Sequence, residues 1–146
     1  MCRRAGESKG AVTDRYHVIA VGTEECENTI AKSAVVTSKK KWEAAIGDAL
    51  GPCYALLRAH TLQATHLAVF VHRAVLPLVP KGSVASAAVA TGLGGALARM
   101  GNKGGIGVTL ALGSTSLCFV NAHLAAHQAS DACWFYMPVQ WLVSCL

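Results

Sequence analysis

Acidic residues are missing from the middle of this sequence. No aspartate or glutamate occurs between Asp48 and Asp131, although the chain has 146 residues and a formal net charge of +5. Such an interval favours a basic surface that attracts polyanions, or else an ordinary solvated face without a ligand. Its basic residues are Arg58, Arg73, Lys81, Arg99 and Lys103, and it also holds most of the histidines.

An apolar leader and a long apolar run are also missing. Residues 1–10 lack the apolar core of a secretory signal peptide. The longest stretch without Asp, Glu, Lys or Arg, Gly104–Ser130, alternates apolar with polar side chains, which is typical of a strand hairpin and not of a transmembrane helix. We therefore expect a cytoplasmic protein, with contact to membranes only at their periphery.

Closely spaced cysteine pairs are absent as well. The six cysteines fall at irregular spacings without a Cys-x-x-Cys pair or a Cys/His ligand pattern. This predicts free thiols in a reducing compartment, because metal sites and redox motifs need regular spacing. With 53% hydrophobic and 14% charged residues, the chain is too apolar for disorder and has the length of one domain.

Strand-forming segments outnumber helical ones. Residues 16–22 form a short apolar run that predicts a strand buried on both faces. Residues 39–50 repeat apolar side chains at intervals of three and four, which predicts a helix capped by Ser38 and ended by Gly51 and Pro52. The pattern as a whole predicts a mixed or antiparallel sheet with a few helices. The remaining strands are expected at 54–62, 65–75, 84–91, 106–112 and 116–124, the last two forming a hairpin about residues 113–115.

The two ends of the chain differ from the middle. Residues 1–15 are polar without periodicity, which predicts an irregular lead. Residues 131–146 gather aromatic side chains in a pattern that fits neither a strand nor a helix. The expected organisation is one partial domain over residues 16–130, between this lead and an aberrant aromatic tail.

Glycines are concentrated in one loop, which raises a dinucleotide-binding hypothesis. Gly92–Ala98 follows a strand, but that fingerprint needs an acidic residue about 20 positions later, and none occurs before Asp131. Further glycines surround Lys103, in Met100-Gly-Asn-Lys-Gly-Gly105. There the backbone can approach an anion closely and the ammonium group can meet it. Taken alone, the segment fits a plain glycine turn with an exposed lysine equally well.

Polar side chains at two strand ends are candidate site residues. Asn121 and His123 share one strand face, roughly 7 Å apart along the strand. A histidine there can donate a proton or hydrogen bond to a phosphate, or can be a satisfied half-buried side chain. After the first strand, Glu24, Glu25 and Glu27 are carboxylates that suit a hard cation such as Mg²⁺, or that stay in solvent.

Together, and in this order, three segments resemble the inositol polyphosphate 5-phosphatases of the endonuclease/exonuclease/phosphatase superfamily. The resemblance covers about residues 16–128. It implies an α/β fold, namely part of a two-sheet sandwich of the DNase I type. It also implies hydrolysis of the 5-phosphate of an inositol polyphosphate or phosphoinositide, with Mg²⁺ as cofactor. The segments are Val21-Gly-Thr-Glu-Glu-Cys-Glu27, Gly101-Asn-Lys-Gly-Gly105 and Phe119-Val-Asn-Ala-His-Leu-Ala-Ala-His127.

The resemblance implies roles for individual residues. Glu25 takes the position of the magnesium ligand, and Glu24 stands where the family often has glutamine. His123 takes the position of the catalytic histidine that contacts the scissile phosphate. Lys103 and Asn121 form the substrate-phosphate group, in which the lysine lies near the phosphates and the asparagine supports the same loop.

Several motifs of the family cannot be found in the 146 residues. They are an opening Trp-Asn, Trp-x-Gly-Asp-x-Asn, Pro-x-Trp-x-Asp-Arg and a closing Asp-His pair, and they include the groups that orient the attacking water. We therefore expect an inactive fragment of a 5-phosphatase domain, which keeps one metal ligand and one phosphate contact. The alternative is a non-catalytic fragment that binds anionic headgroups or a partner.

A nuclease is disfavoured by the pairing of Gly-Asn-Lys-Gly with His-Leu-Ala-Ala, and no nucleic acid partner is expected. Because the strands are expected to supply mainly one of the two sheets, a large apolar sheet face should stay exposed.

Overall fold

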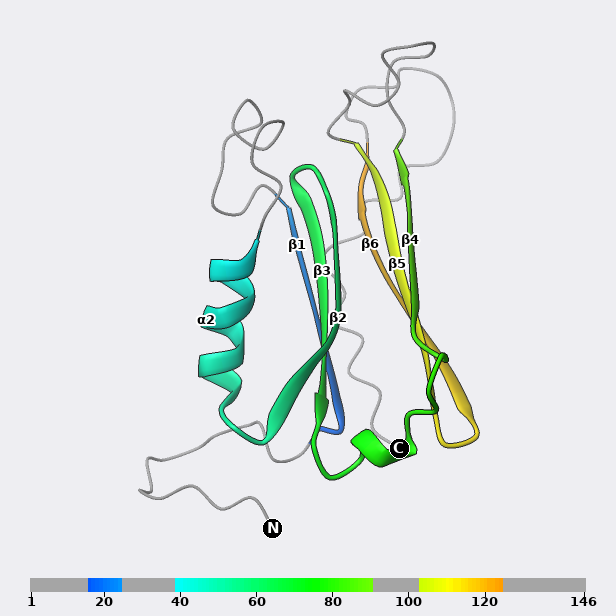
Figure 1. Cartoon of the computed structure of the whole chain (residues 1–146). Helices are drawn as coiled ribbons and strands as arrows, with labels where there is room; N and C mark the ends of the chain where they lie inside the picture. Colours follow the sequence, from blue (N-terminus) through cyan, green and yellow to red (C-terminus); the bar gives the residue numbers. More distant parts are fainter. Residues whose placement is uncertain (1–15, 25–38, 91–102, 125–146) are drawn as a thin grey trace.

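The chain forms two antiparallel sheets that lie against each other, with a helix on the outer side of the first (Figure 1). The computed structural model describes residues 16–24, 39–90 and 103–124. Within them the strand orders are β1-β3-β2 and β4-β5-β6. The expected α/β two-sheet sandwich is confirmed, and every pairing among the described strands is antiparallel. The elements are β1 (Val18–Glu24), α2 (Lys40–Leu50), β2 (Tyr54–Leu62), β3 (Thr65–His72), a short 3₁₀ helix η2 (Leu76–Leu78), β4 (Ala85–Ala90), β5 (Gly104–Leu112) and β6 (Thr115–His123).

Strand β3 is the centre of the first sheet and is buried along almost its whole length. Leu67 and Val69 point to the second sheet, whereas Ala68 and Phe70 belong to the cluster under α2. The prediction of a strand buried on both faces at 16–22 was wrong. That segment became β1, a half-buried edge strand that continues to Glu24. An apolar run shows that a strand is buried, but it does not show which strand of the sheet is central.

Helix α2 confirms the helix predicted at residues 39–50. It begins after Lys39, whose side chain makes no capping hydrogen bond, while Ser38 lies outside the described residues. It ends at Gly51, whose φ of 82° is in the left-handed region that favours glycine. Ile46 and Leu50 pack against the cluster that contains Phe70.

The second sheet presents one apolar face to the first. Strands β5 and β6 form the expected hairpin, with a turn at Gly113, where φ is 59°. Each fully buried side chain between the sheets contributes about 1.5–3 kcal/mol. The expectation that the chain supplies strands mainly for one sheet was wrong, because the core lies between two sheets of three strands each. Its buried members are Leu67, Val69, Ile106, Val108, Leu110 and Phe119.

The prediction of free thiols was wrong for Cys53. Cys53 is disulfide-bonded, whereas Cys118 is free and exposed. Disulfide formation depends on the separation of two cysteines in the folded chain, and irregular spacing along the sequence does not report that separation.

Several other expectations fall on parts of the chain that are not described. The lead at 1–15, the tail at 131–146 and the loop Gly92–Ala98 all lie outside the described residues. In the described part, no helix is long and apolar enough to cross a membrane.

Candidate functional site

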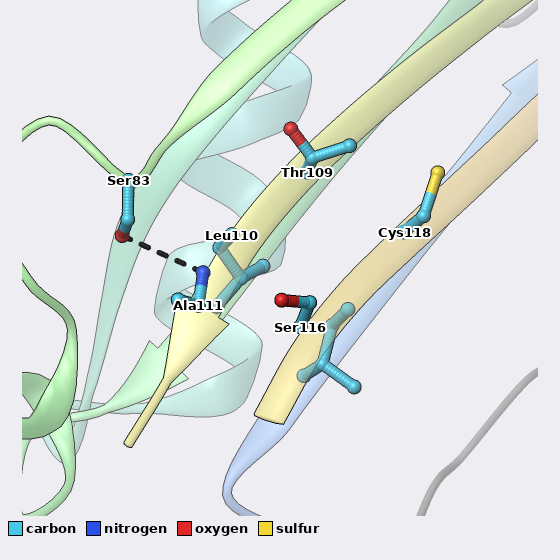
Figure 2. Close-up of a pocket in the computed structure, with 7 residues that line it drawn as sticks. Ser83, Thr109, Leu110, Ala111, Ser116 and Cys118 are labelled. Atoms are coloured by element: carbon cyan, nitrogen blue, oxygen red, sulfur yellow. Dashed lines mark hydrogen bonds between the residues drawn. The ribbon is translucent and has the colours of Figure 1, made fainter. Parts of the chain in front are cut away.

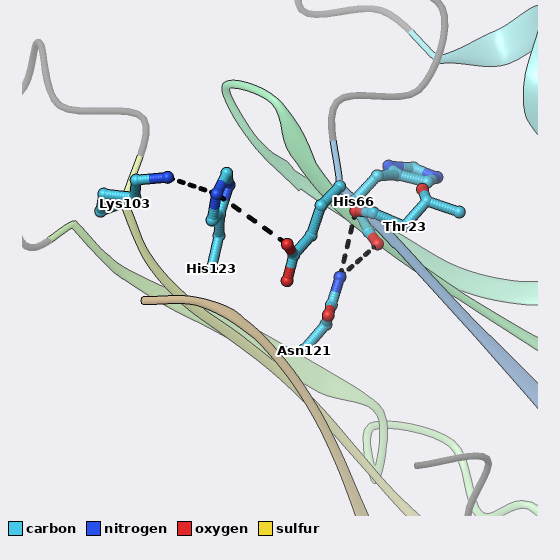
Figure 3. A network of polar contacts seen from close by, with 6 residues as sticks. Thr23, His66, Lys103, Asn121 and His123 are labelled. Atoms are coloured by element: carbon cyan, nitrogen blue, oxygen red, sulfur yellow. Dashed lines mark hydrogen bonds and ion pairs between the residues drawn. The ribbon is translucent and has the colours of Figure 1, made fainter. Parts of the chain in front are cut away.

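Three strand ends meet at one end of the sandwich. Strand β1 ends at Glu24, β6 ends at His123, and Lys103 immediately precedes β5. The register of the hairpin pairs Gly104 with His123, which brings Lys103 beside the histidine. Strands β1 and β6 also contact each other across the two sheets. The fold thus gathers side chains that are nearly 100 residues apart in sequence, as Figure 3 shows.

A cation, an imidazole and a carboxylate converge at this end. Lys103 Nζ contacts His123 Nε2, and Glu24 Oε2 lies 3.9 Å from the same nitrogen (Figure 3). The His123 side chain is 13% exposed and that of Glu24 37%, so the group is sheltered but open to solvent on one side. When the ammonium donates to Nε2, the neutral imidazole carries its hydrogen on Nδ1. That atom is buried and has no hydrogen-bond partner among the described residues.

Asn121 lies between the two sheets, on the same face of β6 as His123. Its Nδ2 donates to the backbone oxygen of Thr23 at 3.2 Å and to that of His66 at 2.9 Å (Figure 3). Both partners are carbonyl oxygens, so the nitrogen and not the oxygen of the amide must face them. A Cβ atom on Gly22 would lie only 2.9 Å from Asn121 Cγ, so the amide packs directly against the bare backbone of β1.

His66 lies behind this junction, on the side of β3 that faces α2. It is fully buried, its Nδ1 is 2.8 Å from Thr61 Oγ1, and its Nε2 is 3.5 Å from Glu43 Oε1. Burial, with smaller contributions from the positive charges of Lys39 and His60, lowers the pKa of His66 from 6.5 to about 4. The imidazole is therefore neutral at pH 7. The backbone oxygen of His66 accepts the hydrogen bond from Asn121 described above.

The structure brings together three of the four residues predicted from the sequence. Lys103, Asn121 and His123 meet at one end of the sandwich, whereas Glu25 lies outside the described residues, directly after Glu24. Gly22 and His66 were not predicted as site residues. Gly22 could have been identified from the sequence, because a glycine stands just before the carboxylates at the end of the first strand.

The candidate metal ligands at this end of the sandwich are carboxylate oxygens. Among the residues that the structure describes, no group of three or more His, Cys, Asp or Glu side chains is placed to hold a metal ion. The Glu24 carboxylate and the carboxylate that follows it in sequence are hard oxygen donors. A donor set of one or two carboxylates fits Mg²⁺, which keeps several waters, better than it fits a metal that needs a full protein cage.

A hollow among the described residues lies at the other end of the second sheet, near the hairpin turn (Figure 2). It has no charged residue in its lining, and Ser83 Oγ accepts a hydrogen bond from the Ala111 amide there. A hollow without a charged side chain gives no basis for binding a phosphate, so the candidate site is the end that holds Lys103 and His123. The lining residues are Ser83, Thr109, Leu110, Ala111, Ser116, Leu117 and Cys118.

Comparisons of the sequence with known proteins agree on one family. The model of endonuclease/exonuclease/phosphatase family 2 matches residues 6–132. Phosphatidylinositol 4,5-bisphosphate 5-phosphatase A of Rattus norvegicus is 36% identical over 122 residues, which are 81% of this chain and 12% of that protein. Synaptojanin-2 of Homo sapiens is 35% identical over 117 residues, or 77% of this chain and 8% of that protein. Inositol-1,4,5-trisphosphate 5-phosphatase 1 of Schizosaccharomyces pombe is 34% identical over 100 residues, or 64% of this chain and 9% of that protein.

A solved structure has a similar fold over part of its length. The inositol polyphosphate 5-phosphatase domain of SpSynaptojanin, in complex with inositol (1,4)-bisphosphate and a calcium ion, has a TM-score of 0.60 and 28% identity. The match covers 76% of this chain and 32% of that chain. The chain therefore spans about a third of the solved domain and only 8–12% of the relatives named above.

Proposed function

Because the chain belongs to the endonuclease/exonuclease/phosphatase family and is part of an inositol polyphosphate 5-phosphatase domain, we propose that it binds the phosphate groups of inositol polyphosphates or phosphoinositides. Such a domain is a phosphoric monoester hydrolase. The observation that carries this proposal is the convergence of Lys103 and His123 beside Glu24 at one end of the sandwich. The names of the relatives support inositol phosphates as the substrate class.

Each of the two basic side chains has a distinct task in this proposal. The Lys103 ammonium is a compact positive charge that attracts a phosphate oxygen. His123 lies beside that ammonium and can donate a hydrogen bond or a proton to the same phosphate. Because the side chain of His123 is 13% exposed, few waters compete for these contacts.

A divalent cation completes the proposed site, and Mg²⁺ fits its donor set. Glu25 is the proposed ligand, with Glu24 beside it in sequence. The calcium ion in the solved relative supports a divalent cation of this hard, oxygen-binding type. When bound, such a cation neutralises charge that develops on the phosphate and activates water.

We also propose that the 146-residue chain alone binds a phosphorylated inositol but does not hydrolyse it. The sequence contains no Gly-Asp-x-Asn and no Asp-His pair, which are the motifs that the family resemblance connects with orienting the water. Removal of a single charge-stabilising group commonly costs about 10²–10³ in rate, and groups that act as a unit do not lose their effects additively.

The headgroup of a membrane phosphoinositide carries the same phosphate groups as a free inositol polyphosphate, and it is the second ligand that we consider. Arg58, Arg73 and Lys81 are exposed and lie in the interval without acids. The cytoplasmic leaflet carries anionic lipids, so basic side chains of this kind favour peripheral contact on the cytoplasmic side. A headgroup-binding fragment without catalysis is the alternative to a phosphatase by descent.

One experiment tests both sources and separates binding from hydrolysis. Binding of inositol (1,4)-bisphosphate in the presence of Mg²⁺ is measured by calorimetry for the chain and for a Lys103→Ala, His123→Ala variant. Phosphate release is measured from inositol (1,4,5)-trisphosphate and from liposomes that carry phosphatidylinositol 4,5-bisphosphate, against a Glu25→Ala, His123→Ala variant. We expect saturable binding that the first variant loses, and no release above the second.

The outcomes decide the proposal. Equal binding by the chain and the Lys103→Ala, His123→Ala variant would place the phosphate site elsewhere. Release well above that of the Glu25→Ala, His123→Ala variant would show that the chain holds a complete active site. The chain is also floated with neutral and with anionic liposomes, and its binding to a single-stranded oligonucleotide is measured by calorimetry. Equal recovery on the two kinds of liposome would remove the membrane arm. Oligonucleotide binding with an affinity equal to that for the inositol phosphate would favour a nucleic-acid function.

A further inference from the structure

We propose that Asn121 is a positioning residue that joins the two sheets at the candidate site, and that residue 22 is a glycine in order to admit its side chain. The amide holds the end of β1, with its carboxylates, in place beside His123. This inference deepens the proposed function and rests on it, because the end that Asn121 would position is the proposed phosphate site.

The hydrogen bonds of Asn121 define its task. Nδ2 has two hydrogens, and these are directed to the backbone oxygens of Thr23 in β1 and His66 in β3. Both acceptors belong to the first sheet, whereas Asn121 belongs to the second. No hydrogen remains on the amide for a phosphate, and Oδ1 can only accept. Neither of these two bonds goes to Lys103, so among the described residues the asparagine supports β1 and β3.

Gly22 makes this junction possible. An added Cβ would lie 2.9 Å from Asn121 Cγ and 3.2 Å from both Nδ2 and Oδ1. Real Cβ atoms do not approach other heavy atoms at 2.9 Å, so a side chain at position 22 would displace the amide from the carbonyl oxygens. Other glycines of the sandwich are not all constrained in this way, since a Cβ on Gly107 would meet nothing within 4 Å.

The contact of Asn121 with Gly22 and Thr23 lies next to the polar side chains of the candidate site. Glu24 follows Thr23, and His123 lies two residues beyond Asn121 on the same face of β6. Glu24 Oε2 lies 3.9 Å from His123 Nε2 across the two sheets, and the Asn121 bond to Thr23 is one residue away from this contact on β1. A shift of β1 relative to β6 would therefore change the surroundings of the imidazole.

A double-mutant cycle tests the contact between Gly22 and Asn121. The equilibrium constant of unfolding is measured in urea for the full chain, Gly22→Ala, Asn121→Ala and the double variant. Overpacking predicts that Gly22→Ala destabilises the otherwise unaltered chain by about tenfold to a hundredfold. In the Asn121→Ala background the clash is removed, and we expect a change of less than about threefold. Gly107→Ala is the matched control and should act equally in both backgrounds.

A spectroscopic readout tests positioning separately from stability. The ¹H–¹³C resonances of the His123 imidazole, assigned with His123→Gln, are recorded without any ligand. We expect Asn121→Ala, Asn121→Asp and Gly22→Ala to displace them, and Gly107→Ala to leave them in place. Asn121→Asp keeps the shape of the side chain but presents a carboxylate to two carbonyl oxygens, so it separates hydrogen bonding from packing. Where Asn121→Ala does not fold, Asn121→Ser takes its place in the cycle.

Additive effects of Gly22→Ala and Asn121→Ala, or a His123 signal that Asn121→Ala leaves unmoved, would overturn the proposal. Since no phosphate or cation is present in either measurement, loss of the proposed function would leave these results unaffected. Conversely, a chain with the expected coupling that binds no inositol phosphate would retain the positioning role and lose only the ligand.

Discussion

At the residue scale, His66 combines full burial with an ionisable ring. The imidazole is placed between Thr61 and Glu43, yet burial and the nearby positive charges of Lys39 and His60 hold its pKa at about 4. In the unfolded chain the same group titrates near pH 6.5. Between these two values the unfolded state binds more protons than the folded state, so the free energy of unfolding must fall as the pH is lowered through this window.

We predict that the chain loses about 2 kcal/mol of stability from His66 alone when the pH falls from 7.5 to 5. The reason is that pH 5 lies between the two pKa values, and below pH 6.5 each pH unit lowers the free energy of unfolding by about 1.4 kcal/mol. Urea unfolding followed by tryptophan fluorescence at pH 7.5, 6 and 5 measures it. His66→Gln should flatten the dependence, while His17→Gln, which alters an exposed histidine, should keep it. An unaltered slope in His66→Gln would contradict the assignment.

Some residues of the site were accessible to sequence reasoning and others were not. Asn121 and His123 could be predicted because alternation along a strand places them on one face, and Lys103 because glycines surround it. The role of His66 depends on its backbone oxygen and on neighbours from other strands, and no spacing in the sequence reports these. The assignment of Asn121 to a phosphate was made without knowing that both of its amide hydrogens would be used.

At the scale of elements, the start of β5 depends on a single glycine. Gly104 has a φ of 153°, and an added Cβ would lie 2.2 Å from the backbone oxygen of Val89 and 2.8 Å from Leu62 Cδ2. This residue pairs with Ala90 on one side and with His123 on the other. The close approach of β4 to β5 at this point keeps Lys103, the preceding residue, at the end of the sandwich.

We predict that Gly104→Ala destabilises the chain by about 2–5 kcal/mol, because backbone strain and a clash with main-chain atoms both oppose it. Gly107→Ala, in the same strand, should change the stability by less than about 1 kcal/mol, since its Cβ would meet nothing within 4 Å. Urea midpoints of the two variants decide the matter. Equal midpoints would show that β4 moves away from β5 at little cost.

The hairpin and the helix were predictable from local sequence, whereas the order of strands was not. The turn at Gly113 and the repeat along residues 40–50 are local signals, and both elements formed as expected. The central position of β3 instead results from pairing with β1 and β2, which both precede it in sequence and flank it in the sheet. Apolar content alone favoured β1 as the buried strand, and β1 is at the edge.

At the scale of the whole molecule, the two sheets cover each other, while within the described residues no element covers the outer face of the second sheet. The residues that alternate with its buried positions carry no charge, and Val89 and Val120 are 67% and 69% exposed. No described residue buries them. The expectation of an exposed inner sheet face was wrong, because the inner faces of the two sheets pack against each other. The outer face consists of Ala85, Ala87, Val89, Gly105, Gly107, Thr109, Ala111, Ser116, Cys118, Val120 and Ala122.

We predict that the chain associates with itself through this outer face, because an uncharged sheet surface of this kind gains free energy when it is removed from water. Sedimentation velocity over a concentration series should show oligomers that increase with concentration. Val120→Lys introduces a charge opposite Gly107, in the middle of the face, and should shift the distribution to monomer. Leu78→Lys alters a residue that is 54% exposed but lies on η2, outside this face, and should leave the distribution unchanged. If the chain stays monomeric at every concentration, or if both lysine variants act alike, the outer face is not the surface through which the molecules associate.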